Sequence, residues 1–213
     1  MLSYQSLDTV NNISVVGTGT IGASWATYFL SKGFKVNAWD PSDGWKQRIL
    51  SFINNAWPQI QSLGFIGEFK ETNIILCSSL EEALTGTDFV QESAPEQLKL
   101  KQSLFKQIDE YTSKNIIVSS STSGLIMRDM QDRLENANRF VVGHPFNPPH
   151  LIPLVEVLGG KNTDVLAVDW AINFYNQIGK HAIKLKKEVP GHLANRLQAA
   201  LWREAVLAVQ NDE

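Results

Sequence analysis

The sequence of 213 residues predicts an α/β fold in which a doubly wound, mostly parallel sheet carries helices on both faces. Short β-branched runs alternate with amphipathic stretches of helical period along most of the chain. One run, 115–119, is apolar almost throughout, which is typical of a parallel strand that is buried on both faces. In addition, a glycine-rich turn joins the first strand directly to the first helix.

Each element can be placed from its period and its end signals. We expect strands at 12–16, 35–39, 74–77, 88–91, 115–119, 140–143, 154–158 and 182–186. We expect helices at 23–33, 43–63, 79–84, 97–111, 164–178 and 198–210. Pro58 would kink or interrupt the second of these helices. The last helix is apolar over much of its surface and should therefore be buried.

The glycine-rich turn, Gly17-Thr-Gly-Thr-Ile-Gly22, has the G-x-G-x-x-G spacing of a dinucleotide-binding, Rossmann-type unit. Gly17 would make the tight turn, Gly19 would let the backbone approach a pyrophosphate, and Gly22 would let the helix pack on the strand. Asp40 ends the second strand, where its carboxylate would bind a ribose 2′-hydroxyl and repel a 2′-phosphate. The pattern predicts NAD as the cofactor, and the alternative is a glycine-rich loop of an unrelated α/β domain. The predicted cofactor-binding residues of this unit are Gly17, Thr18, Gly19, Thr20, Ile21, Gly22 and Asp40.

Three further segments should meet the glycine loop, because ligands of such sheets bind beyond the carboxyl ends of the strands. Residues 92–96 follow one predicted strand, and the hydroxyl-rich segment 119–124 follows the next. His144 follows the strand after that. An acid, hydroxyl groups and a histidine at one edge would suit a dehydrogenase site. The alternative for 119–123 is a serine-rich N-cap of the following helix.

The segment 142–157 places His144, Asn147 and Glu156 close together among prolines, which fix φ and exclude an interior helix. A histidine on a rigid turn, followed by a carboxylate on a second strand, suits a base and its orienting partner. In the alternative interpretation, His144 merely caps a strand and Glu156 is a solvated strand residue.

Composition excludes several classes of function. The net charge is −3 with a pI of about 5.8, so nothing indicates a nucleic-acid or anionic-membrane partner. The single cysteine, Cys77, excludes an internal disulfide and fits a reducing, cytoplasmic compartment. No apolar run is long enough to span a bilayer, no secretion signal is recognisable, and no metal site is expected.

Several motifs in one order resemble the 3-hydroxyacyl-CoA dehydrogenase family, from Ile13 to Gln210. They are the glycine loop, Glu92-Ser-Ala-Pro-Glu96 with Lys101, Ser-Ser-Thr-Ser-Gly-Leu, His-Pro-Phe-Asn-Pro, Leu-Val-Glu-Val and Val-Pro-Gly-His-Leu-Ala-Asn-Arg. The residues of Asn55-Ala-Trp-Pro58 and Lys187-Glu-Val-Pro-Gly191 most resemble those of the family members that oxidise L-carnitine, and next those of the members that oxidise L-gulonate.

The resemblance implies a role for each matching residue. His144 would take the proton of a 3-hydroxyl while hydride leaves for NAD, and Glu156 would orient His144. Ser123 and Asn195 would hydrogen-bond the substrate oxygen, with support from Asn147. The resemblance adds Glu96 and Lys101 to the residues that hold NAD.

Two departures from the family pattern matter. Acyl-CoA members carry many lysines after the second strand, whereas 44–72 contains only Lys46, Arg48 and Lys70 as cations, so a small 3-hydroxy acid is expected.

Family members also continue for about another domain of helices. We therefore expect an NAD-binding domain at 1–188 and, at 189–213, the first helix of an otherwise missing all-α domain. The full-length protein would be a homodimer, and a crystallin-like, non-catalytic NAD-binding protein is the alternative to an enzyme.

Overall fold

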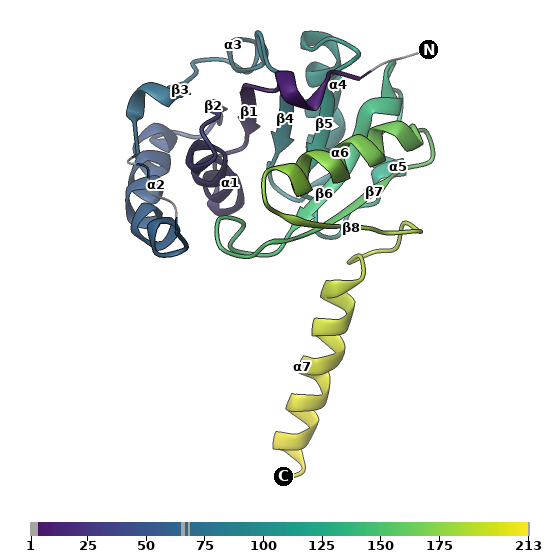
Figure 1. The fold of residues 1–213 in the computed structure, drawn as a ribbon. Helices are drawn as coiled ribbons and strands as arrows, with labels where there is room; N and C mark the ends of the chain where they lie inside the picture. Colours follow the sequence, from purple (N-terminus) through teal and green to yellow (C-terminus); the bar gives the residue numbers. More distant parts are fainter. Residues whose placement is uncertain (1–3, 65–66, 68, 213) are drawn as a thin grey trace.

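The central sheet has eight strands in the order β3-β2-β1-β4-β5-β6-β7-β8, as seen in the computed structural model, which describes residues 4–64, 67 and 69–212 (Figure 1). Neighbouring strands are parallel except β6 and β7. The strands are β1 (Asn12–Val16), β2 (Lys35–Trp39), β3 (Ile74–Leu76), β4 (Phe89–Glu92), β5 (Ile117–Ser120), β6 (Phe140–Pro145), β7 (Leu154–Gly159) and β8 (His181–Lys184). The predicted doubly wound, mostly parallel sheet is confirmed. The strand order, not the strand direction, reverses between β1 and β4, and ligands of open α/β sheets bind at such a switch point.

Seven α-helices connect or follow these strands in the described part of the chain. They are α1 (Thr20–Ser31), α2 (Trp45–Ser62), α3 (Leu80–Leu84), α4 (Leu98–Tyr111), α5 (Met127–Met130), α6 (Val165–Gln177) and α7 (Ala194–Gln210). Three short 3-10 helices lie at Leu7–Thr9, Glu71–Asn73 and Ala137–Arg139. The predicted elements lie where the sequence places them, apart from their ends and from α7, which begins before its predicted start at Gln198. Helix α5 and the three 3-10 helices are not among the predicted elements.

The predicted interruption at Pro58 is wrong, because α2 continues through this residue as one helix. Proline lacks the N–H that the preceding turn would use, so the helix loses a hydrogen bond there. The buried side chains of Ile53, Trp57 and Ile60 lie on either side of Pro58 and pack into the domain. We infer that this packing outweighs the lost hydrogen bond.

The hydrophobic core has two layers, one on each face of the sheet. Side chains alternate along each strand, so that Ile13 and Val15 lie in one layer while Val16 lies in the other. Phe89 and Val90 of β4 divide in the same way. The first layer is covered by α1, α2 and α6, and the second by α3, α4 and α5. This confirms helices on both faces and leaves the carboxyl ends of the strands open.

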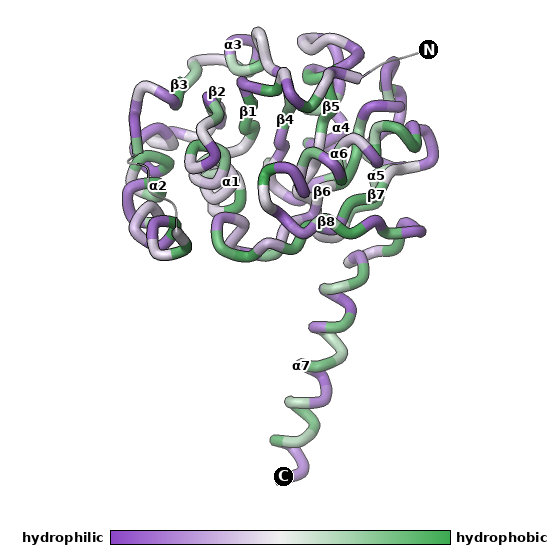
Figure 2. The backbone as a smooth tube through the Cα atoms, viewed as in Figure 1, coloured by the Kyte–Doolittle hydropathy of each residue, from purple (hydrophilic) through white to green (hydrophobic). Residues whose placement is uncertain are grey.

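Helix α7 extends away from the sheet and its helical layers (Figure 1). None of its residues is buried, although it carries apolar side chains such as Leu201 and Trp202. Figure 2 shows hydrophobic and hydrophilic residues alternating along its whole length. The expectation that this helix would be buried is therefore not met within this chain. Of the helices that the structure describes, none is long and apolar enough to cross a membrane.

Candidate active site

The antiparallel hairpin of β6 and β7 places His144 directly opposite Glu156. His144 Nδ1 lies 2.9 Å from Glu156 Oε2, and both side chains are buried. A carboxylate can only accept a hydrogen bond, so Nδ1 carries the hydrogen and Nε2 is left with a free lone pair. The alternative of a solvated Glu156 is wrong, since this residue has no exposed surface.

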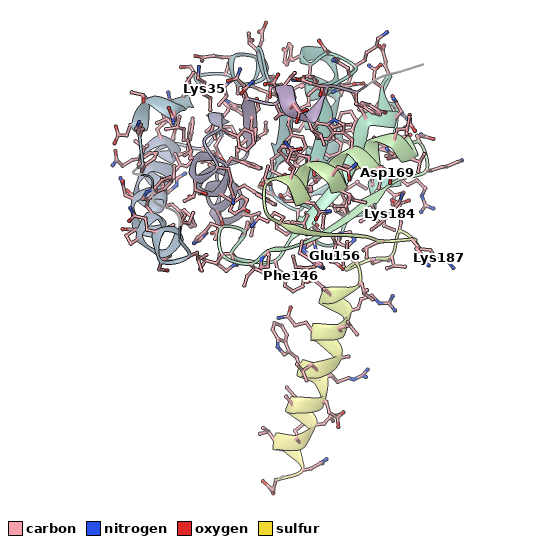
Figure 3. All side chains as sticks on the ribbon, in the orientation of Figure 1. Lys35, Phe146, Glu156, Asp169, Lys184 and Lys187 are labelled. Carbon is pink, nitrogen blue, oxygen red and sulfur yellow. The ribbon has the colours of Figure 1, made fainter. Side chains whose placement is uncertain are left out.

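The second carboxylate oxygen of Glu156 reaches the start of α7. Glu156 Oε1 accepts hydrogen bonds from the backbone N–H groups of Leu193 at 3.0 Å and Ala194 at 2.9 Å. Burial by itself raises the pKa of Glu156, but the hydrogen bonds from His144, Ala194 and Leu193 outweigh it and hold the pKa below its ordinary value. Glu156 is therefore an anion that joins the histidine to the last helix, and Figure 3 shows it close to this junction.

A cavity of about 520 Å³ opens beside His144. Its walls are formed by Ile21, Ser93, Ala94, Glu96, Lys101, Ser121, Ser123, His144, Pro145, Phe146, Asn147, Asn195 and Gln198. The structure thus brings together the predicted residues Ser123, His144, Asn147 and Asn195, which come from three separate segments of the chain. Glu156 does not line this cavity and lies behind His144.

A second cavity, of about 640 Å³, lies over the glycine loop. It is lined by Val16, Gly17, Gly19, Trp39, Asp40, Pro41, Ser42, Ser93, Ala94, Pro95, Leu100, Ser103, Leu104 and Gln107. Ser93 and Ala94 belong to both cavities. The two cavities therefore adjoin at the end of β4, and together they form one long groove along the carboxyl edge of the sheet.

The glycine loop fits an extended phosphate-containing ligand. Gly17 has φ +87°, and a Cβ there would lie 2.7 Å from Ala94 N. A Cβ on Gly22 would lie 1.8 Å from the Gly17 carbonyl oxygen, so α1 could not approach β1 so closely. At Gly19, by contrast, a Cβ would have no described atom within 4 Å. This residue leaves the start of α1 open, where backbone N–H groups and the helix dipole favour an anion.

Asp40 lies beside this loop with most of its acceptor positions occupied. Thr18 N–H donates to Oδ2 at 2.8 Å, while the N–H and Oγ of Ser42 donate to Oδ1 at 2.9 Å and 2.5 Å. A carboxylate has about four acceptor positions, so one remains on Oδ2. Burial raises the pKa of Asp40, but the hydrogen bonds from Ser42 and Thr18 outweigh it and lower the pKa. Asp40 therefore stays ionised at the rim of the groove.

Glu96 organises the loop that follows β5. Its Oε1 accepts hydrogen bonds from Thr122 Oγ1 and from the N–H groups of Ser123, Gly124 and Leu125, at 2.6 to 3.2 Å. The alternative that serines 119–123 cap a helix is wrong, because α5 begins only at Met127 and Ile126 stands at its N-cap without a side-chain hydrogen bond. The strand end is held by a carboxylate from another loop instead.

Lys101 lies deeper than the sequence suggests. Its Nζ is 2.6 Å from Glu92 Oε1 and 3.8 Å from Glu96 Oε2, and its side chain is 1% exposed. Glu92 is fully buried and also accepts from Ser120 Oγ at 2.5 Å and Ala94 N at 2.6 Å. Lys101 therefore contributes to the cavity wall while its charge is balanced by Glu92.

Sequence reasoning assigned no role to two polar residues here, Glu92 and His192. Glu92 ends β4, in register with Val16 and Ser120 at the ends of β1 and β5, and this alignment was the signal that could have identified it. His192 lies in the Val-Pro-Gly-His-Leu-Ala-Asn-Arg motif. Only in the folded chain, however, does its ring come to 5.0 Å from the His144 ring, centroid to centroid. Within the described ranges, no group of three or more His, Cys, Asp or Glu residues could hold a metal ion.

Comparison with known sequences identifies the relatives of this chain. The family model described as 3-hydroxyacyl-CoA dehydrogenase, NAD binding domain, matches residues 12–189. L-carnitine dehydrogenase of Streptomyces griseus is 49% identical over 204 residues, which is 96% of this chain and 61% of that protein. The L-carnitine dehydrogenase of Streptomyces coelicolor is 45% identical over 98% of this chain and 65% of its own length. The chain thus spans about three-fifths of the curated relatives that it matches.

Solved structures agree with this result. One is 5-formyl-3-hydroxy-2-methylpyridine 4-carboxylic acid 5-dehydrogenase, an NAD-dependent dismutase. It superposes with a TM-score of 0.88 at 31% identity, covering 95% of this chain and 66% of that one. The 3-hydroxybutyryl-CoA dehydrogenase of Escherichia coli gives a TM-score of 0.83 at 26% identity, covering 95% of this chain and 43% of that one. The matched NAD-binding model also agrees with the cofactor that the glycine loop and Asp40 predict. The chain therefore belongs to the 3-hydroxyacyl-CoA dehydrogenase family and contains its NAD-binding domain.

Proposed function

We propose that this chain is the NAD-binding part of a dehydrogenase that oxidises the 3-hydroxyl group of a small 3-hydroxy acid. L-carnitine, which would give 3-dehydrocarnitine, is the first candidate because relatives that bear this name are 49% and 45% identical to the chain. The observation that carries the proposal is the buried His144–Glu156 pair on the wall of a cavity that adjoins the glycine-loop groove.

The chemistry assigned to the chain begins with proton removal. His144 Nε2 takes the proton of the 3-hydroxyl, since Nδ1 is already held by Glu156. The anionic Glu156 then stabilises the imidazolium that forms. NAD, when bound, accepts the hydride from C3 of the substrate. Ser123 and Asn195, with support from Asn147, would hydrogen-bond the substrate oxygen, and all three line the cavity.

The cofactor would lie along the groove in an extended conformation. In this proposal the backbone of 17–22 holds the pyrophosphate and Asp40 binds the adenine-side ribose. Glu96 and Lys101 form the wall next to the nicotinamide end, beside His144. Residues 1–188 are the cofactor domain, and 189–213 begin a helical domain through which the full-length protein would form a homodimer.

The region after β2 supports a small acid over a CoA ester. Of its three cations, Arg48 is engaged by the carbonyl of Asp43 at 2.6 Å and by Ser42 Oγ at 2.8 Å. Only Lys46 and Lys70 remain to meet the phosphates of a CoA, and both are exposed. An arrangement with so few free cations would bind such a polyanion weakly.

The test is a comparison of NADH formation with L-carnitine, L-gulonate and a 3-hydroxybutyryl-CoA ester. We would run it on the 213-residue chain and on a chimera that adds the remaining part of the Streptomyces griseus relative. The expected result is the highest kcat/KM with L-carnitine. A clear preference for the CoA ester would contradict the substrate, and no turnover by the NAD-bound chimera with any of the three would contradict the proposed activity.

The ribose contact of Asp40 makes a further prediction. In the Asp40→Asn variant, we expect the Kd for NAD to rise about ten- to a hundredfold, because a charge-assisted hydrogen bond is lost. The Kd for NADP should rise far less, since the carboxylate that repels a 2′-phosphate is lost as well. Asp43→Asn removes the same charge from an exposed neighbour and is the control. Calorimetric titration measures both constants, and equal losses for both cofactors would contradict the ribose contact.

A further inference from the structure

His192 is a buried histidine in an unusual backbone conformation just before α7. Its side chain is 2% exposed, and its φ is +49°, a value that side-chain-bearing residues seldom adopt. The preceding Gly191 also has a positive φ, of +75°. A left-handed backbone at a buried, bulky residue persists only where surrounding contacts hold it. The contacts of His192 therefore need an explanation.

The imidazole of His192 makes one directed hydrogen bond. Its Nε2 lies 3.0 Å from the carbonyl oxygen of Thr122, which can only accept, so Nε2 carries the hydrogen. Its Nδ1 is buried and has no hydrogen-bond partner among the residues that the structure describes. Burial lowers the pKa of His192 more than the hydrogen bond to Thr122 raises it, and the neighbouring His144 lowers it further. The lowered pKa favours an uncharged ring at neutral pH.

The same segment holds the partner of the base. Leu193 and Ala194, which directly follow His192, donate their N–H groups to Glu156. Three consecutive residues thus connect α7 to the end of β5 and to the carboxylate behind His144. Since none of the residues of α7 is buried, these contacts at its start largely set its direction. Asn195, in the first turn of α7, lines the same cavity as His144.

We propose that His192 is a positioning residue that locks the start of α7 to the end of β5 and so places Asn195 and Ser123 around the substrate oxygen. The part of this inference that concerns the substrate oxygen rests on the proposed function. The contact of His192 with Thr122 fixes the loop that carries Ser123, and its neighbours fix the helix that carries Asn195. Both hydrogen-bonding groups are thereby set relative to His144.

Amide hydrogen exchange tests this placement without any substrate. His192→Phe keeps a planar ring but removes the donor, whereas His192→Gln keeps a donor. In His192→Phe, we expect exchange at the N–H groups of Leu193 and Ala194 to rise about five- to tenfold, the loss of roughly one hydrogen bond. Exchange in β1 and β4 should not change. His192→Gln should restore most of the protection, and His181→Phe, the same change at an exposed histidine, should have no effect.

Two exchange results would overturn the proposal: unchanged protection at Leu193 and Ala194 in His192→Phe, or an equal rise throughout the sheet. If His192→Phe does not fold, nitrogen NMR of the unaltered chain decides. A neutral His192 with its hydrogen on Nε2 at about pH 7 is expected, whereas a doubly protonated ring or the other tautomer would overturn the placement.

Kinetics then connect the placement to the reaction. In the form of the protein that turns over substrate, His192→Phe should lower kcat/KM for the hydroxy acid about tenfold, with the Kd for NAD unchanged. A similar loss of NAD affinity would indicate a general structural role and overturn the proposal. If no form turns over any hydroxy acid, the proposed function fails, whereas the exchange result still decides whether His192 holds α7.

Discussion

The His144→Gln variant should form NADH about a hundred- to ten-thousandfold more slowly than the unaltered protein, because it would lose the proposed general base. His144 is the histidine on the cavity wall, and the buried carboxylate of Glu156 holds it through the 2.9 Å contact with Nδ1. Glutamine has a similar length and can still hydrogen-bond Glu156, but its amide does not accept a proton near neutral pH. The structural change is therefore small compared with the chemical one.

The His144→Gln variant should lose the formation of NADH but keep its affinity for NAD. The Kd for NAD should stay within about threefold, since His144 lies outside the glycine-loop cavity. His181→Gln is the matched control, because His181 is exposed on β8 and should keep full activity. Turnover of His144→Gln at the unaltered rate would show that the base is another group. If the unaltered protein turned over no hydroxy acid at all, the non-catalytic alternative would be favoured instead.

Glu156→Gln is expected to have an effect of similar size for a different reason. The amide oxygen of glutamine can still accept from Leu193 and Ala194, which would direct its NH2 group towards His144 Nδ1. Nδ1 would then have to accept a hydrogen bond, which moves the imidazole hydrogen to Nε2. The nitrogen that faces the substrate would carry a hydrogen and could not act as a base. We expect kcat to fall about a hundred- to ten-thousandfold, with NAD binding retained.

The same variant tests the ionised state of Glu156 through stability. The pKa of Glu156 is lowered in the folded protein, so its charge contributes stability above the pKa of an unfolded glutamate. That contribution is lost as the pH falls through the lowered, folded-state pKa. The Tm difference between the unaltered protein and Glu156→Gln should therefore be largest near neutral pH and shrink in acid.

Glu110→Gln is the control for both experiments, because its side chain is 57% exposed and distant from the hairpin. It should change neither the rate nor the pH dependence of Tm. A Tm difference for Glu156→Gln that did not depend on pH would show that Glu156 is already neutral in the folded protein. An unchanged kcat would contradict its role in orienting His144.

Local signals in the sequence were sufficient for the elements and for part of the site. Strand and helix positions follow from hydrophobic periods of two and 3.6 residues, which each segment carries by itself. The glycine loop is equally local, because its spacing lies within one turn and Gly22 is required by its close approach to the Gly17 carbonyl oxygen. The pairing of His144 with Glu156 was also within reach, since both residues belong to one hairpin.

The sequence pattern does not predict which side chains from distant segments come into contact. Lys101 was predicted to face the cofactor, yet Glu92 balances its charge in the interior. The sequence left a helix cap open as an alternative role for serines 119–123, yet Glu96 from the preceding loop accepts hydrogen bonds from the backbone N–H groups there. Each buried charge has to be satisfied by whichever group the fold brings near it, and no sequence period records that choice.

The sequence by itself therefore determined the class of the sheet, the cofactor loop and the pairing of His144 with Glu156, because these depend on residues that are neighbours along the chain or in one hairpin. Only the tertiary structure decided that one carboxylate, Glu156, serves both His144 and the start of α7. Likewise, only the fold brought His192 to the end of β5. The physical reason is that hydrogen-bonding groups pair by position in space, and β5, β7 and α7 become neighbours there only when the sheet has assembled.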